Sequence, residues 1–197
     1  MADDAGKRRD VRFLSGWLVA ALLLASGILW AVIAFGTLAH LQRLAGGLPP
    51  FDIRPLGYGY DDARAFLCAL GPQGRAYYLD PELVLDSVFP PLYALSLALA
   101  LWWLTMPGRL RAAATPTVWR WTLVAIPLVM AAVDGGVENV CIATMLWRWP
   151  DLTPGLVRLA SLATQVKLLL LAVTAMMMVA LAVVALWRWL IRRRLST

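Results

Sequence analysis

Residues 168–187 read LLLLAVTAMMMVALAVVALW, a run that contains no charged side chain. The hydrocarbon core of a membrane is about 30 Å thick, and a helix rises about 1.5 Å per residue, so about 20 apolar residues are needed to cross it. The run therefore predicts a membrane-spanning helix. The run ends at Trp187, and Arg188 and Trp189 follow directly; such aromatic and basic residues are typical of the border between lipid and water.

Three further stretches repeat this pattern. Residues 13–39 and 87–108 carry no charged residue, and residues 121–147 carry only Asp134 and Glu138. Over the whole chain, 61% of residues are hydrophobic, 15% are charged and the mean hydropathy is +0.70, a balance displaced from that of soluble domains. We therefore predict an all-α membrane protein, a four-transmembrane-helix bundle that forms a single domain over residues 1–197. The predicted spans are residues 13–39, 85–105, 119–146 and 158–189.

The basic residues indicate how the bundle is oriented. Most of the 18 lie at the two termini or between residues 109 and 120: Lys7, Arg8, Arg9, Arg12, Arg109, Arg111, Arg120, Arg188, Arg192, Arg193 and Arg194. Basic residues that flank spans are retained on the cytoplasmic side, so we expect both termini in the cytoplasm of a multi-pass protein, in a bacterial inner membrane. The net charge of +6 is thus a topology signal, and we expect no nucleic-acid partner. A homo-oligomer is compatible with the sequence.

The 40–85 connection is the one sizeable segment expected outside the membrane, as an external loop over residues 40–84. The run Gly46-Gly47-Leu48-Pro49-Pro50 cannot continue a helix. From Asp61-Asp62 onward, apolar residues recur at helical spacing until Gly71-Pro72, which predicts a short amphipathic helix on the outer surface. The second span is expected to start at Asp80-Pro81-Glu82, a sequence suited to a helix N-terminus.

Ionisable residues inside the predicted spans are the main candidates for function, because they are costly in lipid. Counting about 20 residues outward from each cytoplasmic boundary places Asp86, Asp134, Glu138 and Lys167 in the outer half of the bundle. Asp134 and Glu138 are four residues apart, so they project from one face of a helix. The candidate binding cluster consists of Asp86, Asp134, Glu138, Asn139 and Lys167.

Two interpretations of this cluster stay open. In the first, Lys167 neutralises Asp134 or Glu138 in a structural ion-pair network. In the second, the cluster is a pocket in the outer leaflet that binds a lipid-like molecule or a membrane-protein partner, with the loop above it contributing Arg54, Tyr58 and Arg75. An intramembrane acid/base enzyme that acts on lipid-like substrates is the alternative function. A proton-coupled transporter subunit is a third, disfavoured by the small number of helices.

The sequence lacks the residues that several other kinds of site require. With two cysteines and one histidine, the chain has too few ligands for a structural zinc site or for multi-histidine metal or haem ligation. It has no phosphate-binding Gly-Lys-Ser/Thr loop, no nucleophile elbow and no Cys-x-x-Cys motif. We therefore expect no metal and no cofactor, and the sequence identifies no catalytic residue.

The orientation is testable through Cys68, which lies in the predicted external loop. A membrane-impermeant thiol reagent should label reduced Cys68 in intact cells when it is added from outside, because the loop faces away from the cytoplasm. A variant with Cys68→Ser provides the background signal. Labelling that requires access from the cytoplasmic side would overturn the orientation.

Overall fold

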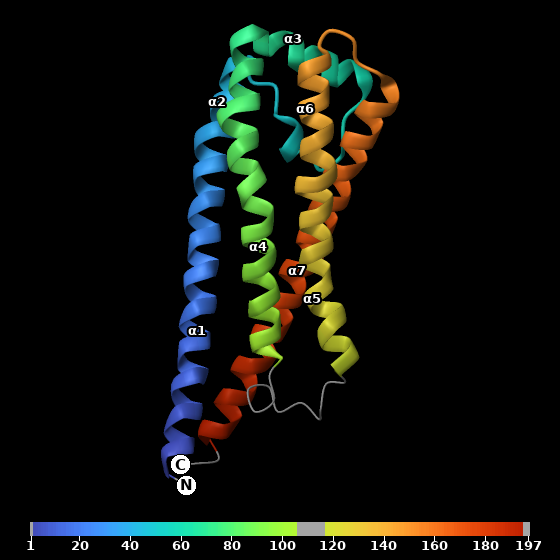
Figure 1. Ribbon diagram of the computed structural model, residues 1–197. Helices are drawn as coiled ribbons and strands as arrows, with labels where there is room; N and C mark the ends of the chain where they lie inside the picture. The colour runs from blue at the N-terminus through green and yellow to red at the C-terminus, as the bar shows by residue number, and fades with distance from the viewer. Residues whose placement is uncertain (1, 106–116, 195–197) are drawn as a thin grey trace.

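The computed structural model describes residues 2–105 and 117–194, and every regular element in this part of the chain is a helix. Four helical segments are long and apolar enough to cross a membrane: Gly16–Leu44, Tyr60–Leu104, Val118–Arg148 and Pro154–Trp187. The predicted all-helical fold with four long apolar helices is thereby confirmed. The first helix begins, and the last helix ends, at the same end of the bundle (Figure 1).

The first and third segments each contain a π-helical stretch between two α-helices. In the first segment the order is α1 (Ala2–Ala31), η1 (Val32–Leu38) and α2 (Ala39–Leu44). In the third it is α5 (Thr117–Val133), η4 (Asp134–Glu138) and α6 (Asn139–Arg148). The last segment is one helix of 41 residues, α7 (Pro154–Arg194), which runs obliquely behind the others in Figure 1.

The second segment changes direction before it enters the bundle. Helix α3 (Tyr60–Tyr77) lies across the end of the bundle, and α4 (Leu83–Leu104) then runs along it (Figure 1). The backbone leaves helical geometry at Gly71, with φ at +62°, and again at Asp80, inside η3 (Tyr78–Glu82). The helix that was expected to stop at Gly71-Pro72 resumes after the break, whereas the expected start near Pro81 coincides with the second break.

Helix α4 occupies the centre of the packing. It contacts α1 on one side and α5 on the other, while α7 packs against α5 and α6. Ser26 on α1 and Ser96 on α4 share a buried hydrogen bond, with their hydroxyl oxygens 2.7 Å apart. In lipid, where apolar packing gives helices little reason to prefer one partner, such small polar contacts help to set which faces meet.

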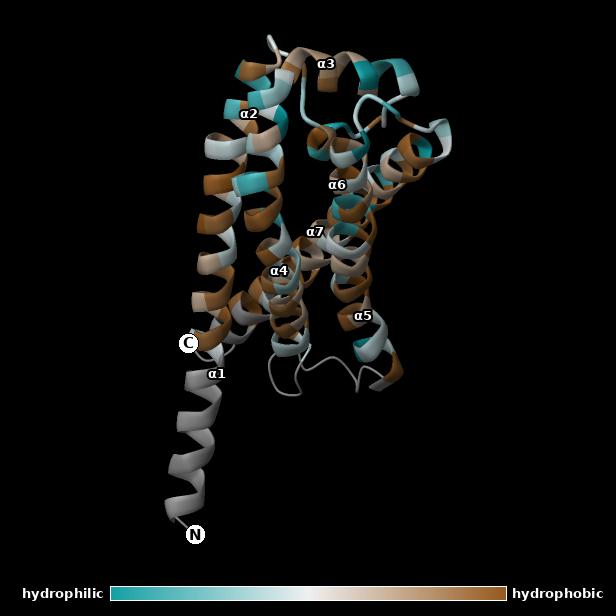
Figure 2. Cartoon of the chain, turned by 45° about the horizontal axis from the view of Figure 1, so that its top comes forward, coloured by the Kyte–Doolittle hydropathy of each residue, from teal (hydrophilic) through white to brown (hydrophobic). Residues whose placement is uncertain are grey.

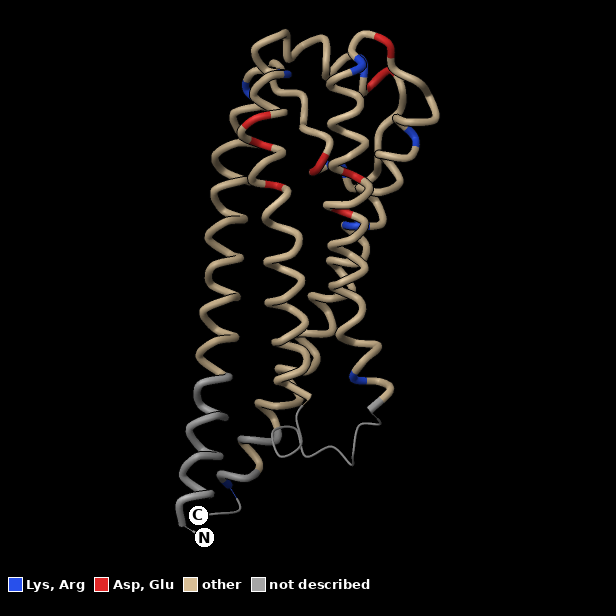
Figure 3. Tube along the Cα trace, viewed as in Figure 1, with Lys and Arg blue, Asp and Glu red and all other residues tan. Residues whose placement is uncertain are grey.

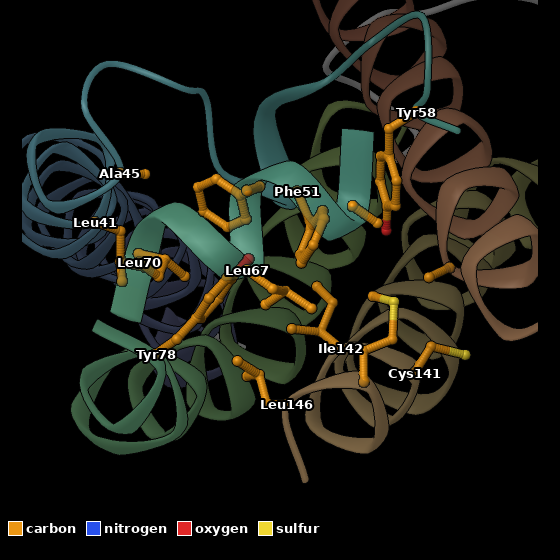
Figure 4. Close-up of a cluster of buried hydrophobic side chains, with 14 of the residues drawn as sticks. Leu41, Ala45, Phe51, Tyr58, Leu67, Leu70, Tyr78, Cys141, Ile142 and Leu146 are labelled. Carbon is orange, nitrogen blue, oxygen red and sulfur yellow. The ribbon is translucent and has the colours of Figure 1, made fainter. Parts of the chain in front are cut away.

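The chain between α2 and α3 enters the bundle instead of lying on top of it. Its 3₁₀ turn η2 (Phe51–Ile53) contacts α7, and the Phe51 side chain is fully buried. Phe51 packs against Tyr58, Phe66 and Tyr78 with ring centroids 4.7 to 6.1 Å apart, in the cluster of buried side chains drawn in Figure 4. This aromatic packing holds the loop inside the bundle.

The surfaces of the helices that face away from the interior of the bundle are apolar and exposed. Large hydrophobic side chains point outward from the bundle on α1 and η1 and along α7; they include Leu24, Phe35, Leu169, Met176 and Val179. Hydrophobic residues accordingly dominate the described lengths of α1 and α7 in Figure 2, and hydrophilic residues gather toward α3. A continuous apolar surface of this kind is costly in water and suits contact with lipid.

Gly57 gives a test of how the loop is seated. Its φ is +75°, and a methyl group added there would lie 2.3 Å from Gln165 Nε2 and 2.6 Å from Ser161 Oγ, both on α7. Gly57→Ala should therefore lower the free energy of unfolding by about 1–2 kcal/mol, because alanine is strained in that backbone conformation. Its methyl group should in addition push the loop away from α7. The loss of stability is measured by thermal unfolding in detergent, with the reactivity of buried Cys141 in a Cys68→Ser background as the probe of unfolding.

The matched control is Gly46→Ala. Gly46 also has a positive φ, +65°, but open space surrounds the position where its Cβ would be. It should therefore show the backbone penalty alone, and a melting temperature as low as that of Gly57→Ala would contradict the close packing of the loop on α7.

Candidate functional site

Five buried carboxyl groups gather in the half of the bundle that carries α3, where the acidic residues lie in Figure 3. Each has less than a tenth of its surface exposed. One comes from η2, two from the junction of η3 with α4, and two from η4: Asp52, Glu82, Asp86, Asp134 and Glu138. Asp86 interacts electrostatically with Asp52, Glu82 and Asp134, and Glu138 does so with Asp52 and Asp134. We call these five residues the acidic cluster.

Asp134 and Glu138 occupy the two ends of η4 and share one lysine from α7. Lys167 Nζ lies 2.7 Å from Glu138 Oε2 and 3.2 Å from Asp134 Oδ1. Thr164 Oγ1 donates a hydrogen bond of 2.7 Å to Glu138 Oε1, and the Tyr93 hydroxyl donates one of 3.0 Å to Asp134 Oδ2. All four carboxyl oxygens of this pair therefore have a partner. We call this part the paired half of the cluster.

The other three carboxyl groups are poorly partnered. Both oxygens of Glu82, Oδ2 of Asp86 and Oδ1 of Asp52 are buried without a hydrogen-bond partner in the structure. Tyr78 donates a hydrogen bond to the remaining Oδ2 of Asp52. Within residues 2–105 and 117–194, no lysine or arginine forms an ion pair with any of these three. We call Asp52, Glu82 and Asp86 the unpaired half.

Asn139 joins the two halves. Its Nδ2 donates a hydrogen bond of 3.0 Å to the main-chain oxygen of Asp86, which links α6 to α4 beside the unpaired half. Its Oδ1 is buried and accepts no hydrogen bond. Apart from the Tyr58 hydroxyl, which is also buried without a hydrogen-bond partner, the unpartnered atoms of this region are oxygens that can only accept a hydrogen bond unless a carboxyl group is protonated.

The charge balance follows from these contacts. A carboxylate transferred from water to a protein interior loses several kcal/mol unless a cation or hydrogen bonds compensate it. Lys167 is the one buried cation that the structure shows among the five carboxyl groups, and it neutralises one negative charge. The cluster therefore holds more carboxyl groups than buried cations, and a bound cation or further hydrogen-bond donors would offset this imbalance.

Two local features place the halves side by side. η4 carries both Asp134 and Glu138, and π-helical stretches inside α-helices are rare and frequent at functional sites. Gly135 in η4 faces Pro90 of α4, whose Cγ would lie 3.4 Å from an added Cβ, whereas Gly136 has open space around it. The close approach of α4 to η4 at Gly135 brings the two acidic segments together.

The residues expected from the sequence divide into two groups. Asp86, Asp134, Glu138, Asn139 and Lys167 lie together, as do Ser161 and Thr164 beside them. Tyr58 from the loop also belongs here, since its main-chain N–H donates to Ser161 Oγ at 2.8 Å. Burial, with Glu138 and Asp52 nearby, raises the pKa of the Tyr58 phenol well above its usual value, so this side chain stays a neutral donor.

The two arginines of the loop do not join the cluster. The guanidinium of Arg54 lies over the rings of Phe51, Tyr58 and Phe66 and donates two hydrogen bonds to the Pro49 carbonyl oxygen.

Arg75 likewise lies away from the carboxyl groups. It packs over the Trp149 ring at 5.2 Å and donates to the Leu67 carbonyl oxygen. Both arginines therefore hold parts of the α3 end together and neutralise none of the buried acids.

Asp52, Glu82 and Tyr93 were missed as site residues. Glu82 had been assigned to the favourable N-terminal end of a helix, although it lies four residues before Asp86, the same spacing as Asp134 and Glu138. That repeated spacing is a signal in the sequence. Nothing in the sequence indicates that Asp52 enters the bundle, because this depends on how the loop packs around Phe51.

Comparison with protein-family models, curated proteins and solved structures gives no match for this chain. Among the described residues, no group of three or more histidine, cysteine, aspartate or glutamate side chains has an arrangement that could hold a metal ion.

Lys167 offers a test of the paired half. Lys167→Met leaves Asp134 and Glu138 buried without their cation, and removing one partner of a buried ion pair typically lowers the free energy of unfolding by about 3–5 kcal/mol. Arg158→Met, which removes an exposed cation from the same helix, should leave the melting temperature nearly unchanged.

The double variant with Lys167→Met and Glu138→Gln distinguishes charge from packing. It should regain part of the lost stability, because one fewer buried carboxyl group then lacks a partner. A Lys167→Met protein as stable as Arg158→Met would show that the ion pairs contribute nothing to the fold.

Proposed function

We propose that this chain is a multi-pass membrane protein whose acidic cluster binds a lipid-like molecule with a cationic or hydroxyl-bearing headgroup. In this proposal both termini are cytoplasmic, the membrane is a bacterial inner membrane, and the α3 end, with its short amphipathic helix, faces outward. Support for the orientation comes from the basic residues at the termini and between residues 109 and 120. The cluster then lies at the depth of the outer leaflet.

The observation that carries the proposal is the unpaired half of the cluster. Glu82, Asp86 and Asp52 are buried, have free acceptor oxygens and have no basic partner in the described chain. A headgroup with a positive charge or with hydroxyl donors would supply what these oxygens lack. The apolar outer faces of the helices would at the same time suit acyl chains, so a molecule that combines both parts fits this setting.

Binding is a better account of the cluster than acid/base catalysis by Asp134 and Glu138. A catalytic base needs an oxygen that can reach the substrate proton. The oxygens of these two residues are instead held by Lys167, Thr164 and Tyr93. This arrangement favours a structural role for the paired half and leaves binding to the unpaired half.

Native mass spectrometry of the purified protein tests the proposal. The wild type should retain a lipid-like molecule through gentle detergent extraction. The double variant Glu82→Gln and Asp86→Asn should retain at least about tenfold less, because each hydrogen bond to a charged group contributes roughly 1.5–3 kcal/mol. Both substitutions keep the shape of the side chain, so the fold should persist.

Asp151→Asn serves as the matched control, because Asp151 is an exposed acid outside the cluster. It should retain the molecule as the wild type does. A wild type that carries no lipid-like molecule, or a double variant that carries as much as the wild type, would count against the proposal. A co-purified membrane protein in place of a lipid would identify the ligand as a protein partner.

A further inference from the structure

The acidic cluster holds more carboxyl groups than the charges around it can neutralise. The groups that face it from every packed element include one cation and several neutral donors. The cation is Lys167 from α7, and the neutral donors are Tyr58 from the loop, Tyr78 from η3, Tyr93 from α4 and Cys141 from α6. The acids are Asp52 from η2, Glu82 from η3, Asp86 from α4, and Asp134 and Glu138 from η4. The adjacent η1 contributes no acid or base; its Thr37 hydroxyl donates a hydrogen bond to the Ile33 carbonyl oxygen and lies near the carboxyl group of Glu82.

The unpartnered atoms show where the imbalance is located. Glu82 Oε1 and Oε2, Asp86 Oδ2 and Asp52 Oδ1 are buried acceptors without donors. Asn139 is not an acid, but it shows the same lack of donors. Its side chain is 5% exposed, and its Nδ2 donates a hydrogen bond to the main-chain oxygen of Asp86. Its Oδ1 is a further buried acceptor without a partner. Protons on Glu82 and Asp86 would supply missing donors and remove buried negative charge from this pair.

A positively charged ligand changes this balance. If the carboxyl groups are protonated in the free protein, a cation that enters beside them meets neutral groups and gains little electrostatic attraction. If one carboxyl group loses its proton as the cation arrives, the buried site stays electrically neutral and gains an ion pair. The second route avoids both an uncompensated carboxylate and an uncompensated cation.

We propose that the acidic cluster exchanges protons for the positive charge of its ligand, releasing one proton from the Glu82 and Asp86 pair for each positive charge bound. This inference rests on the proposed function and specifies the ligand as a cation. A carboxylic acid and a cation in solution become a carboxylate–cation pair, and the proton leaves to water at the α3 end. No bond other than the O–H bond is broken, and no oxidant or co-reactant takes part.

Glu82 and Asp86 are the source of the proton because of their place in the cluster. Their four-residue spacing on one helix sets two carboxyl groups side by side, where they can share one headgroup. Asp134 and Glu138 have the same spacing, but Lys167 already contacts both of them and neutralises one negative charge there. Asp52 has one oxygen engaged by Tyr78, which leaves it a secondary contributor.

Calorimetry with a defined probe tests the exchange. Dodecyltrimethylammonium suits this purpose, because its quaternary nitrogen carries a fixed charge and has no proton of its own to lose. The wild-type protein in lipid nanodiscs is titrated at neutral pH in two buffers that differ in ionisation enthalpy, with empty nanodiscs subtracted. The difference between the two enthalpies should correspond to about one proton released per probe bound, as the charge balance requires. Dodecanol, the neutral analogue, should release none.

Infrared difference spectra provide a second readout. Probe binding should reduce the C=O stretching band of protonated carboxylic acids and increase the carboxylate bands. The double variant Glu82→Gln and Asp86→Asn should bind the probe at least about tenfold more weakly and lack the carboxyl signal, whereas Asp151→Asn should match the wild type. Because the amide side chains resemble protonated acids in size and shape, the double variant should keep the wild-type fold, which its melting temperature checks.

The outcomes separate the two proposals. Saturable binding of the probe without proton release would overturn the exchange and leave ligand binding in place. Release that persists undiminished in the double variant would overturn the assignment to Glu82 and Asp86. A wild type that does not bind the probe would overturn the cation specificity, while a lipid retained in native mass spectrometry would still support binding of a neutral, hydroxyl-bearing molecule.

Discussion

The ion pairs of Lys167 with Asp134 and Glu138 determine how the last helix meets the third span. Two carboxyl groups four residues apart repel each other when both are ionised, and a lysine inside an apolar bundle is costly when it is alone. Each group therefore needs the other. Thr164 and Tyr93 occupy the two oxygens that Lys167 leaves free, so α7, η4 and α4 are held in one register by a single set of contacts.

That same set of contacts explains the character of the rest of the cluster. Because the positive charge of Lys167 is used by η4, Glu82 at the end of η3 and Asp86 on α4 have no cation of their own. The close packing at Gly135 and Pro90 keeps α4 near η4, and both carboxyl groups are buried there. The contacts that hold α4 against η4 therefore place the unpaired half beside the paired half.

The sequence was sufficient for the parts of the structure that depend on uninterrupted length and spacing. Four apolar runs predicted four helices, and helix depth predicted that Asp86, Asp134, Glu138 and Lys167 would meet. The sequence was insufficient where position depends on tertiary packing. Glu82 was interpreted as a charge at a helix end. Its burial depends on the packing of η3 against η1, which the order of residues along the chain does not reveal. Asp52 was hidden for a stronger reason, because a loop rich in glycine and proline has no periodicity from which burial can be counted.

The burial of Asp52 also has a bearing on what the cluster is for. Its position follows from its neighbour Phe51, whose ring is enclosed by Tyr58, Phe66 and Tyr78, and from the contact of η2 with α7. The apolar packing of the loop therefore carries an acid into a region that is already rich in acids, at an electrostatic cost that the packing must offset.

Departures of this kind from local preference are expected where a site serves a purpose other than stability. A fold that needed only to hold its helices together would gain from an apolar or basic residue in place of Asp52. Its presence beside Glu82 and Asp86 adds a further carboxyl group where none is needed for packing. This is the property that a binding site for positive charge requires.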